Sequence, residues 1–68
     1  MNNTIFLVLS LWGDNIVYIK KAAVIAVAQS TCINYDEHNN YPCTKVTLNS
    51  GSVFEVKNTV DQVIVKLK

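Results

Sequence analysis

The sequence predicts a mainly β fold: a small, five-stranded, antiparallel and strongly bent sheet, or an SH3-like open barrel, with one C-terminal α-helix. Two observations predict it. Short runs rich in β-branched and aromatic residues recur along the chain, separated by clusters of Gly, Asn, Asp and Ser. The segment 59–67 instead carries apolar side chains at helical spacing. At 68 residues the chain is long enough for one domain, which we take as residues 1–68.

The first two expected strands form a hairpin. Residues 5–11 are a continuous apolar run broken only by Ser10, which is typical of a buried strand. The turn cluster 13–15 follows, and 16–19 is the returning strand. No Lys or Arg precedes the apolar run, and it is far too short to span a membrane, so we expect a core strand and not a targeting segment. Residues 20–23 are either one helical turn or an irregular link.

A third strand is expected over 24–32, followed by a polar reversal of the chain. The alanines of this strand, Ala26 and Ala28, are small enough either to fit under larger neighbours or to let a ligand or a second backbone come close. Residues 34–42 are the most polar stretch of the sequence. We therefore expect them to form a long exposed hairpin tip.

Two further strands and the helix complete the chain. The strands are expected over 44–48 and 53–57, joined by a turn that contains a glycine. A helix over 59–67 is too short to be stable alone, so it must dock on the sheet. Thr59 and Gln62 have the spacing of a capping box. The helix face expected to lie inward consists of Val60, Val63, Ile64 and Leu67.

The order of these elements resembles a known family. Residues 13–27 run through a turn, NIVYI, two lysines and VIAV, and residues 44–67 read TKVTLNSGSVFEVKNTVDQVIVKL. Together they resemble the small FlbD-like β-rich proteins of flagellar operons and phages, with a departure at the longer, more polar 34–42. The resemblance implies a small unit that acts by binding and carries no catalytic signature. Eight asparagines and no arginine are typical of an AT-rich genome, so we expect a phage or a low-GC bacterium as the source and the cytoplasm of the bacterial host cell as the location.

Composition narrows the function classes. Half of the residues are apolar and the formal charge is only +1. Because so short a chain cannot bury all of this apolar surface, we expect a homo-oligomer. The favoured function is a non-catalytic module that binds a host protein or small ligand, as an inhibitor or sequestering protein does. The alternative is a small nucleic-acid-binding regulator, which scattered lysines without arginine favour less. No phosphate loop or nucleophile–base pair is evident, so we expect no enzyme, no cofactor and no membrane partner.

Two cysteines flank the expected tip. Cys32 and Cys43, with His38 as the sole histidine and Asp36 and Glu37 beside it, fall short of the four tetrahedral ligands that zinc prefers, so we expect no metal site. Directly opposed across a symmetric hairpin neck, the two cysteines would be within reach of a disulfide and would point away from the core. In a reducing cytosol they would stay thiols, so the sequence leaves the bond open.

The candidate binding site is the edge formed by the 34–42 tip and the adjoining strand ends. Loops held by a rigid scaffold often carry function, and this one would exceed the about two to five residues usual in a hairpin. The alternative is a tolerated insertion without a role. The candidate binding residues are Tyr35, Asp36, Glu37, His38 and Tyr41.

Overall fold

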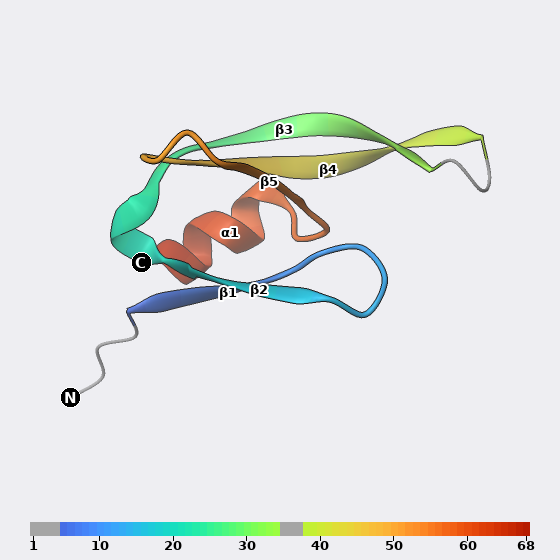
Figure 1. Cartoon of the computed structure of the whole chain (residues 1–68). Helices are drawn as coiled ribbons and strands as arrows, with labels where there is room; N and C mark the ends of the chain where they lie inside the picture. The colour runs from blue at the N-terminus through green and yellow to red at the C-terminus, as the bar shows by residue number, and fades with distance from the viewer. Residues whose placement is uncertain (1–4, 35–37) are drawn as a thin grey trace.

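The computed structural model describes residues 5–34 and 38–68 (Figure 1). Five antiparallel strands form two sheets, and one α-helix ends the chain. The predicted mainly β class with a C-terminal helix is therefore confirmed. Among the described residues the strands do not close into a barrel, because the two sheets are not joined by a strand ladder.

The first sheet is the predicted hairpin of β1 (Phe6–Ser10) and β2 (Ile16–Lys20). The link that follows is one turn of 3-10 helix, η1 (Lys21–Ala23). The prediction that 5–11 is buried as a whole is wrong, because only alternate side chains face the core and nothing among the described residues covers the other face. The buried side chains of this hairpin are Leu7, Leu9 and Ile19.

The second sheet has the order β3-β4-β5. Its strands are β3 (Val24–Asn34), β4 (Asn39–Leu48) and β5 (Val53–Val56). The prediction of a long tip over 34–42 is wrong, because β3 and β4 pair as far as Asn34 and Asn39. The polar composition of 39–42 reflects an exposed strand, in which backbone pairing and not burial fixes the conformation.

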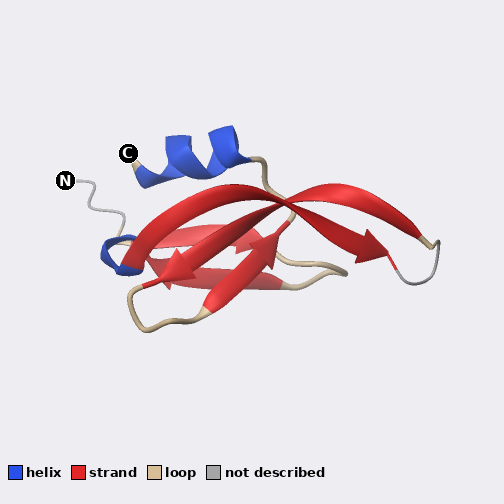
Figure 2. Cartoon of the chain, turned by 90° about the horizontal axis from the view of Figure 1, so that it is seen from above, coloured by secondary structure: helices blue, strands red, loops and turns tan. Residues whose placement is uncertain are grey.

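The helix α1 (Val60–Leu67) packs against β3 and β1, and Figure 1 shows it between the two sheets. Its capping box is confirmed: the Gln62 N–H donates to Thr59 Oγ1 at 3.1 Å, and the Thr59 N–H donates to Gln62 Oε1 at 2.9 Å. Viewed from above, α1 covers one flank of the strands (Figure 2). The buried core that it completes consists of Leu7, Leu9, Ile19, Val46, Val56 and Val63.

One residue of the expected inner helix face is misplaced. Ile64 is 39% exposed, whereas Val63 beside it is fully buried. Because α1 contacts β3 and β1 on the Val63 side, Ile64 lies at the margin of that contact and not in it. The helix is also not a candidate membrane span, since no helix in the described part of the chain is long and apolar enough to cross a bilayer.

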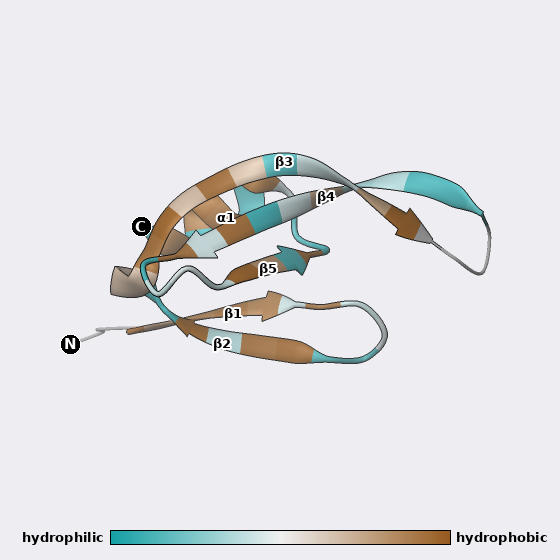
Figure 3. Cartoon of the chain, turned by 45° about the horizontal axis from the view of Figure 1, so that its top comes forward, coloured by the Kyte–Doolittle hydropathy of each residue, from teal (hydrophilic) through white to brown (hydrophobic). Residues whose placement is uncertain are grey.

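The two sheets are joined by hydrogen bonds between the end of β1 and the segment after β5. The Lys57 N–H donates to the Ser10 carbonyl at 2.8 Å, and the Ser10 N–H donates to Asn58 Oδ1 at 2.8 Å. The buried Thr44 hydroxyl donates to the Asn58 carbonyl. β1 and β5 accordingly lie side by side (Figure 3). Asn58 thus connects the first sheet, the second sheet and the helix start.

Candidate functional site

The end of the β3–β4 ladder projects from the rest of the molecule. Pairing with β5 ends at Thr44, whereas the β3–β4 ladder continues from Ser30 and Cys43 outward. We call the described residues 30–34 and 38–43 the arm (Figure 1). The molecule is consequently elongated, at 45 × 23 × 19 Å, and its radius of gyration is 12.5 Å. A compact chain of this length would have a radius of about 11 Å.

A disulfide between Cys32 and Cys43 lies within the arm, with a Cα–Cα distance of 5.9 Å. The prediction that the two cysteines are directly opposed is wrong, because Cys32 pairs with Tyr41 and Cys43 pairs with Ser30. The disulfide is therefore diagonal, and the strong twist of a two-stranded ribbon accounts for the close approach. Figure 2 shows β3 and β4 crossing in this region.

The two cysteines are buried, whereas the sequence analysis expected both to point away from the core. Cys32 is 7% exposed and Cys43 is 4% exposed. Glu55 of β5 lies next to them, with a carboxylate oxygen within 4.8 Å of both sulfur atoms. These three groups are a weak basis for a metal site, since a metal binds thiolates and the sulfurs here are bonded to each other.

An aromatic contact joins the arm to the β1–β2 turn. The ring centroids of Trp12 and Tyr41 are 4.2 Å apart, with an interplanar angle of 64°. Lys57 Nζ lies 5.5 Å from the Trp12 ring centroid and donates to the Gly13 carbonyl at 3.3 Å. Burial, and to a smaller extent the nearby Glu55 carboxylate, raise the pKa of Tyr41. The base of the arm is therefore held by packing against a turn of the other sheet.

Of the five predicted site residues, the structure describes only His38 and Tyr41. Tyr35, Asp36 and Glu37 lie outside the described residues. His38 is exposed and adopts a positive φ of 54° at the turn, whereas Tyr41 packs on Trp12 at the other end of the arm.

Trp12 directly precedes the turn cluster 13–15 in the sequence. Sequence reasoning could not pair Trp12 with a tyrosine from another sheet, and it did not single out Lys57 or Glu55. Nothing in the local sequence pattern marked these two charged residues as neighbours of the arm.

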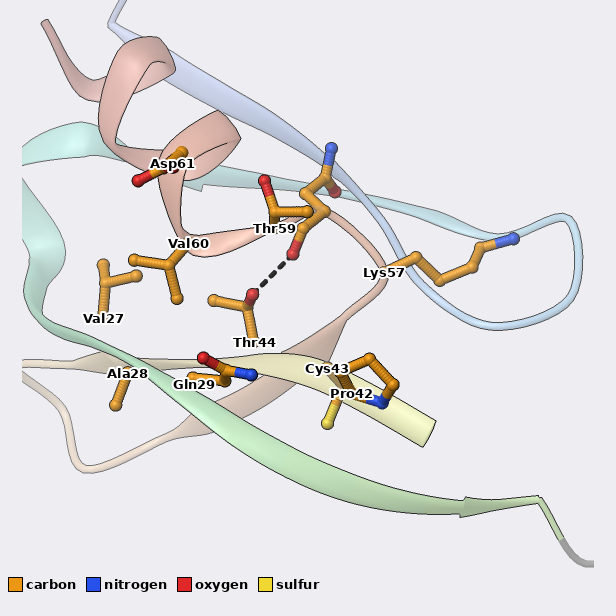
Figure 4. A pocket seen from close by; sticks show the side chains of 11 residues that line it. Val27, Ala28, Gln29, Pro42, Cys43, Thr44, Lys57, Thr59, Val60 and Asp61 are labelled. Carbon is orange, nitrogen blue, oxygen red and sulfur yellow. Dashed lines mark hydrogen bonds between the residues drawn. The ribbon is translucent and has the colours of Figure 1, made fainter. Parts of the chain in front are cut away.

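An open groove lies where the arm meets the start of α1 (Figure 4). Its volume is about 680 Å³, within the range of small-molecule sites of roughly 300–1,000 Å³. Its central polar groups are already used: the Thr44 hydroxyl donates to the Asn58 carbonyl, and Thr59 caps the helix. Ala28 lines the groove and is exposed, so it does not fit under larger neighbours. The groove is large enough for a small ligand and has a mixed polar and apolar lining. The Thr44 and Thr59 hydroxyls, however, are used in hydrogen bonds that stabilise the fold.

A second, shallower hollow of about 520 Å³ runs along the arm itself. It is formed by uncharged side chains of the two arm strands and their bases. The lining residues are Gln29, Ser30, Thr31, Asn40, Tyr41 and Pro42.

Comparisons of the chain with protein-family models, with curated proteins and with solved structures found no match. The resemblance to FlbD-like proteins therefore stays a prediction that depends on the residues quoted for it.

Proposed function

We propose that the chain is a non-catalytic binding module that acts on a protein partner through its arm, as a phage-encoded inhibitor or sequestering protein would. The observation that carries the proposal is the position of the disulfide. The Cys32–Cys43 bond lies in a projecting ladder, outside the main hydrophobic cluster. In an oxidising compartment, where this bond persists, it restricts mainly the arm itself. A segment that is ordered beforehand loses less entropy when it binds.

The surface of the arm suits a protein better than a nucleic acid. Its described residues include no Lys, Arg, Asp or Glu, whereas nucleic-acid binding depends on positive charge near phosphate. Ile33 is 54% exposed and offers an apolar anchor among hydroxyl and amide groups. Beyond Thr44, β4 has no second neighbour in the described part of the chain. Its open edge is of the kind that accepts an added strand from a partner.

The test shortens the arm and leaves its base unchanged. Because Cys32 and Tyr41 pair directly, an Asn-Gly turn between them can replace residues 33–40. This variant retains both cysteines and the Tyr41–Trp12 contact. We expect far-UV circular dichroism and Tm to stay close to wild type, and capture of a specific protein from bacterial host lysate to be lost.

The matched control is Ser50→Ala, in the exposed turn of the same sheet, which should retain capture. A salt titration addresses the nucleic-acid alternative, since such binding weakens steeply as salt rises. A shortened protein that holds the same partner with unchanged affinity would show that the arm is not the binding site.

A further inference from the structure

The β1–β2 hairpin has an uncovered apolar face. The side chains of one face are buried in the core, whereas four large apolar side chains on the other face are exposed to solvent. We call these four the hairpin face: Phe6 (46% exposed), Val8 (39%), Ile16 (55%) and Tyr18 (63%). In Figure 3 most of β1 and β2 carries the colour of hydrophobic residues.

The four side chains form one continuous patch. The hairpin ladder has hydrogen-bonded ends, since the Lys21 N–H donates to the Ile5 carbonyl and the Leu11 N–H donates to the Asn15 carbonyl. Hydrogen-bonded and non-hydrogen-bonded pairs alternate along an antiparallel ladder. Val8 and Tyr18, which are directly opposed, are therefore a non-hydrogen-bonded pair. In such pairs the side chains approach most closely. Phe6 and Ile16 lie diagonally on either side of this central pair.

The patch supplies most of the apolar area that one side of a dimer interface buries. With about 150–250 Å² for a large apolar side chain, the four exposed fractions amount to roughly 400 Å². One side of a standard interface buries about 800 Å², of which about 450–520 Å² is apolar.

We infer that the hairpin face packs against the same face of a second copy across a two-fold axis, so that two hairpins form a small sandwich. Such a contact is isologous, and an apolar patch is complementary to itself. Among the described residues of β1 and β2, Lys20 at one end of β2 is the only charged side chain on this side of the hairpin. The contact therefore buries no charge at its centre. A lone two-stranded hairpin is marginally stable, so covering its second face also stabilises the fold.

This inference is independent of the proposed function. The arm belongs to β3 and β4 and extends beyond the hairpin turn (Figure 1), and its contact with that turn, Tyr41 on Trp12, involves no residue of the hairpin face. A dimer formed through the hairpin face would present two arms, which increases avidity for a partner that has two sites. The arm-shortened variant should therefore dimerise as wild type does, even if it binds no partner.

The first experiment is sedimentation equilibrium of the purified chain from micromolar to sub-millimolar concentration. Wild type should show a reversible monomer–dimer equilibrium, and Tyr18→Ser should raise the dimer Kd by about tenfold or more. Val65→Ser is the matched control, because Val65 is 67% exposed but lies on the helix. It should leave the Kd unchanged. Wild type that stays monomeric at every concentration would overturn the inference, as would equal effects of the two variants.

A second experiment reports the contact directly and does not depend on a loss of binding. Val8→Cys places a thiol at the centre of the hairpin face, and Val65→Cys places one on the helix. Under mild oxidation the first variant should form a covalent dimer and the second should stay monomeric. Cross-linking of Val65→Cys alone would place the contact elsewhere. Circular dichroism and Tm verify that each variant is folded.

Discussion

Replacing Asn58 by alanine should weaken the connection between the two sheets. Asn58 Oδ1 accepts the Ser10 N–H at 2.8 Å, and the Asn58 carbonyl accepts the Thr44 hydroxyl. Asn58→Ala retains the carbonyl, so only the bond to Ser10 is lost. Both residues of that bond are half-buried. The Ser10 N–H would then have no acceptor from the protein and only partial access to water.

The size of the effect follows from that partial burial. A buried donor that is left without an acceptor costs about 1–3 kcal/mol. Since water partly reaches this site, we expect the lower part of that range, about 1–2 kcal/mol. In a domain of this size each kcal/mol lowers Tm by about 4–8 °C, so Tm should fall by about 4–16 °C. Asn58→Asp retains an acceptor oxygen and should lose less than half as much.

Thermal and urea unfolding followed by circular dichroism measure these differences. Asn49→Ala is the matched control, because Asn49 lies in an exposed turn and the bond from its N–H to Ala23 involves only the backbone. Its stability should stay within about 0.5 kcal/mol of wild type. If Asn58→Ala is as stable as Asn49→Ala, the side chain does not join the sheets. If Asn58→Asp is as unstable as Asn58→Ala, the loss of stability is not caused by the missing acceptor oxygen.

Three further predictions follow from the site and the helix. Replacing both Cys32 and Cys43 by Ser should cost about 2.5–3 kcal/mol for a sequence separation of 11. Hydrogen exchange should show the arm losing protection first, and unchanged protection would contradict this. Thr59→Ala should cost about 1 kcal/mol in urea unfolding, whereas Thr59→Ser should cost little. The pKa of Tyr41 is raised, mainly by burial and secondarily by Glu55. The folded state therefore favours the neutral hydroxyl of Tyr41. The stability that this preference contributes is complete below about pH 10 and is lost as the pH rises through the pKa of the folded state. Tyr41→Phe should therefore lose less stability at alkaline pH than wild type, and an equal loss would refute the role of Tyr41. Glu55→Gln should lower the pKa of Tyr41 in an ultraviolet titration without restoring its ordinary value.

Elements with a strong local pattern could be predicted from the sequence. The hairpin turn contains Gly13 with a φ of 72°, which glycine adopts without strain. The C-terminal helix begins where Thr59 and Gln62 satisfy each other's backbone, as their spacing predicted. In both places a few adjacent residues determine the conformation.

The arm could not be predicted because its order is not local. Residues 39–42 read Asn-Asn-Tyr-Pro, a poor strand composition, yet they pair with β3. Pro42 is tolerated at a position where β4 has no second neighbour. The contact of Trp12 with Tyr41, and the diagonal approach of Cys32 to Cys43, depend on how far the ribbon twists. Residue parity along one strand carries no information about that twist.

The first strand shows where the prediction and the structure differ most usefully. A strand with one covered face needs apolar residues only at alternate positions, as in antiparallel sheets with one face in water. Residues 5–9 are apolar at every position, a pattern typical of strands covered on both faces. In the structure Leu7 and Leu9 are buried, but Phe6 and Val8 are exposed. The returning strand repeats the mismatch at Tyr18. The composition of this hairpin is therefore that of a sheet with two covered faces, and a second copy packed on the hairpin face would supply the missing cover.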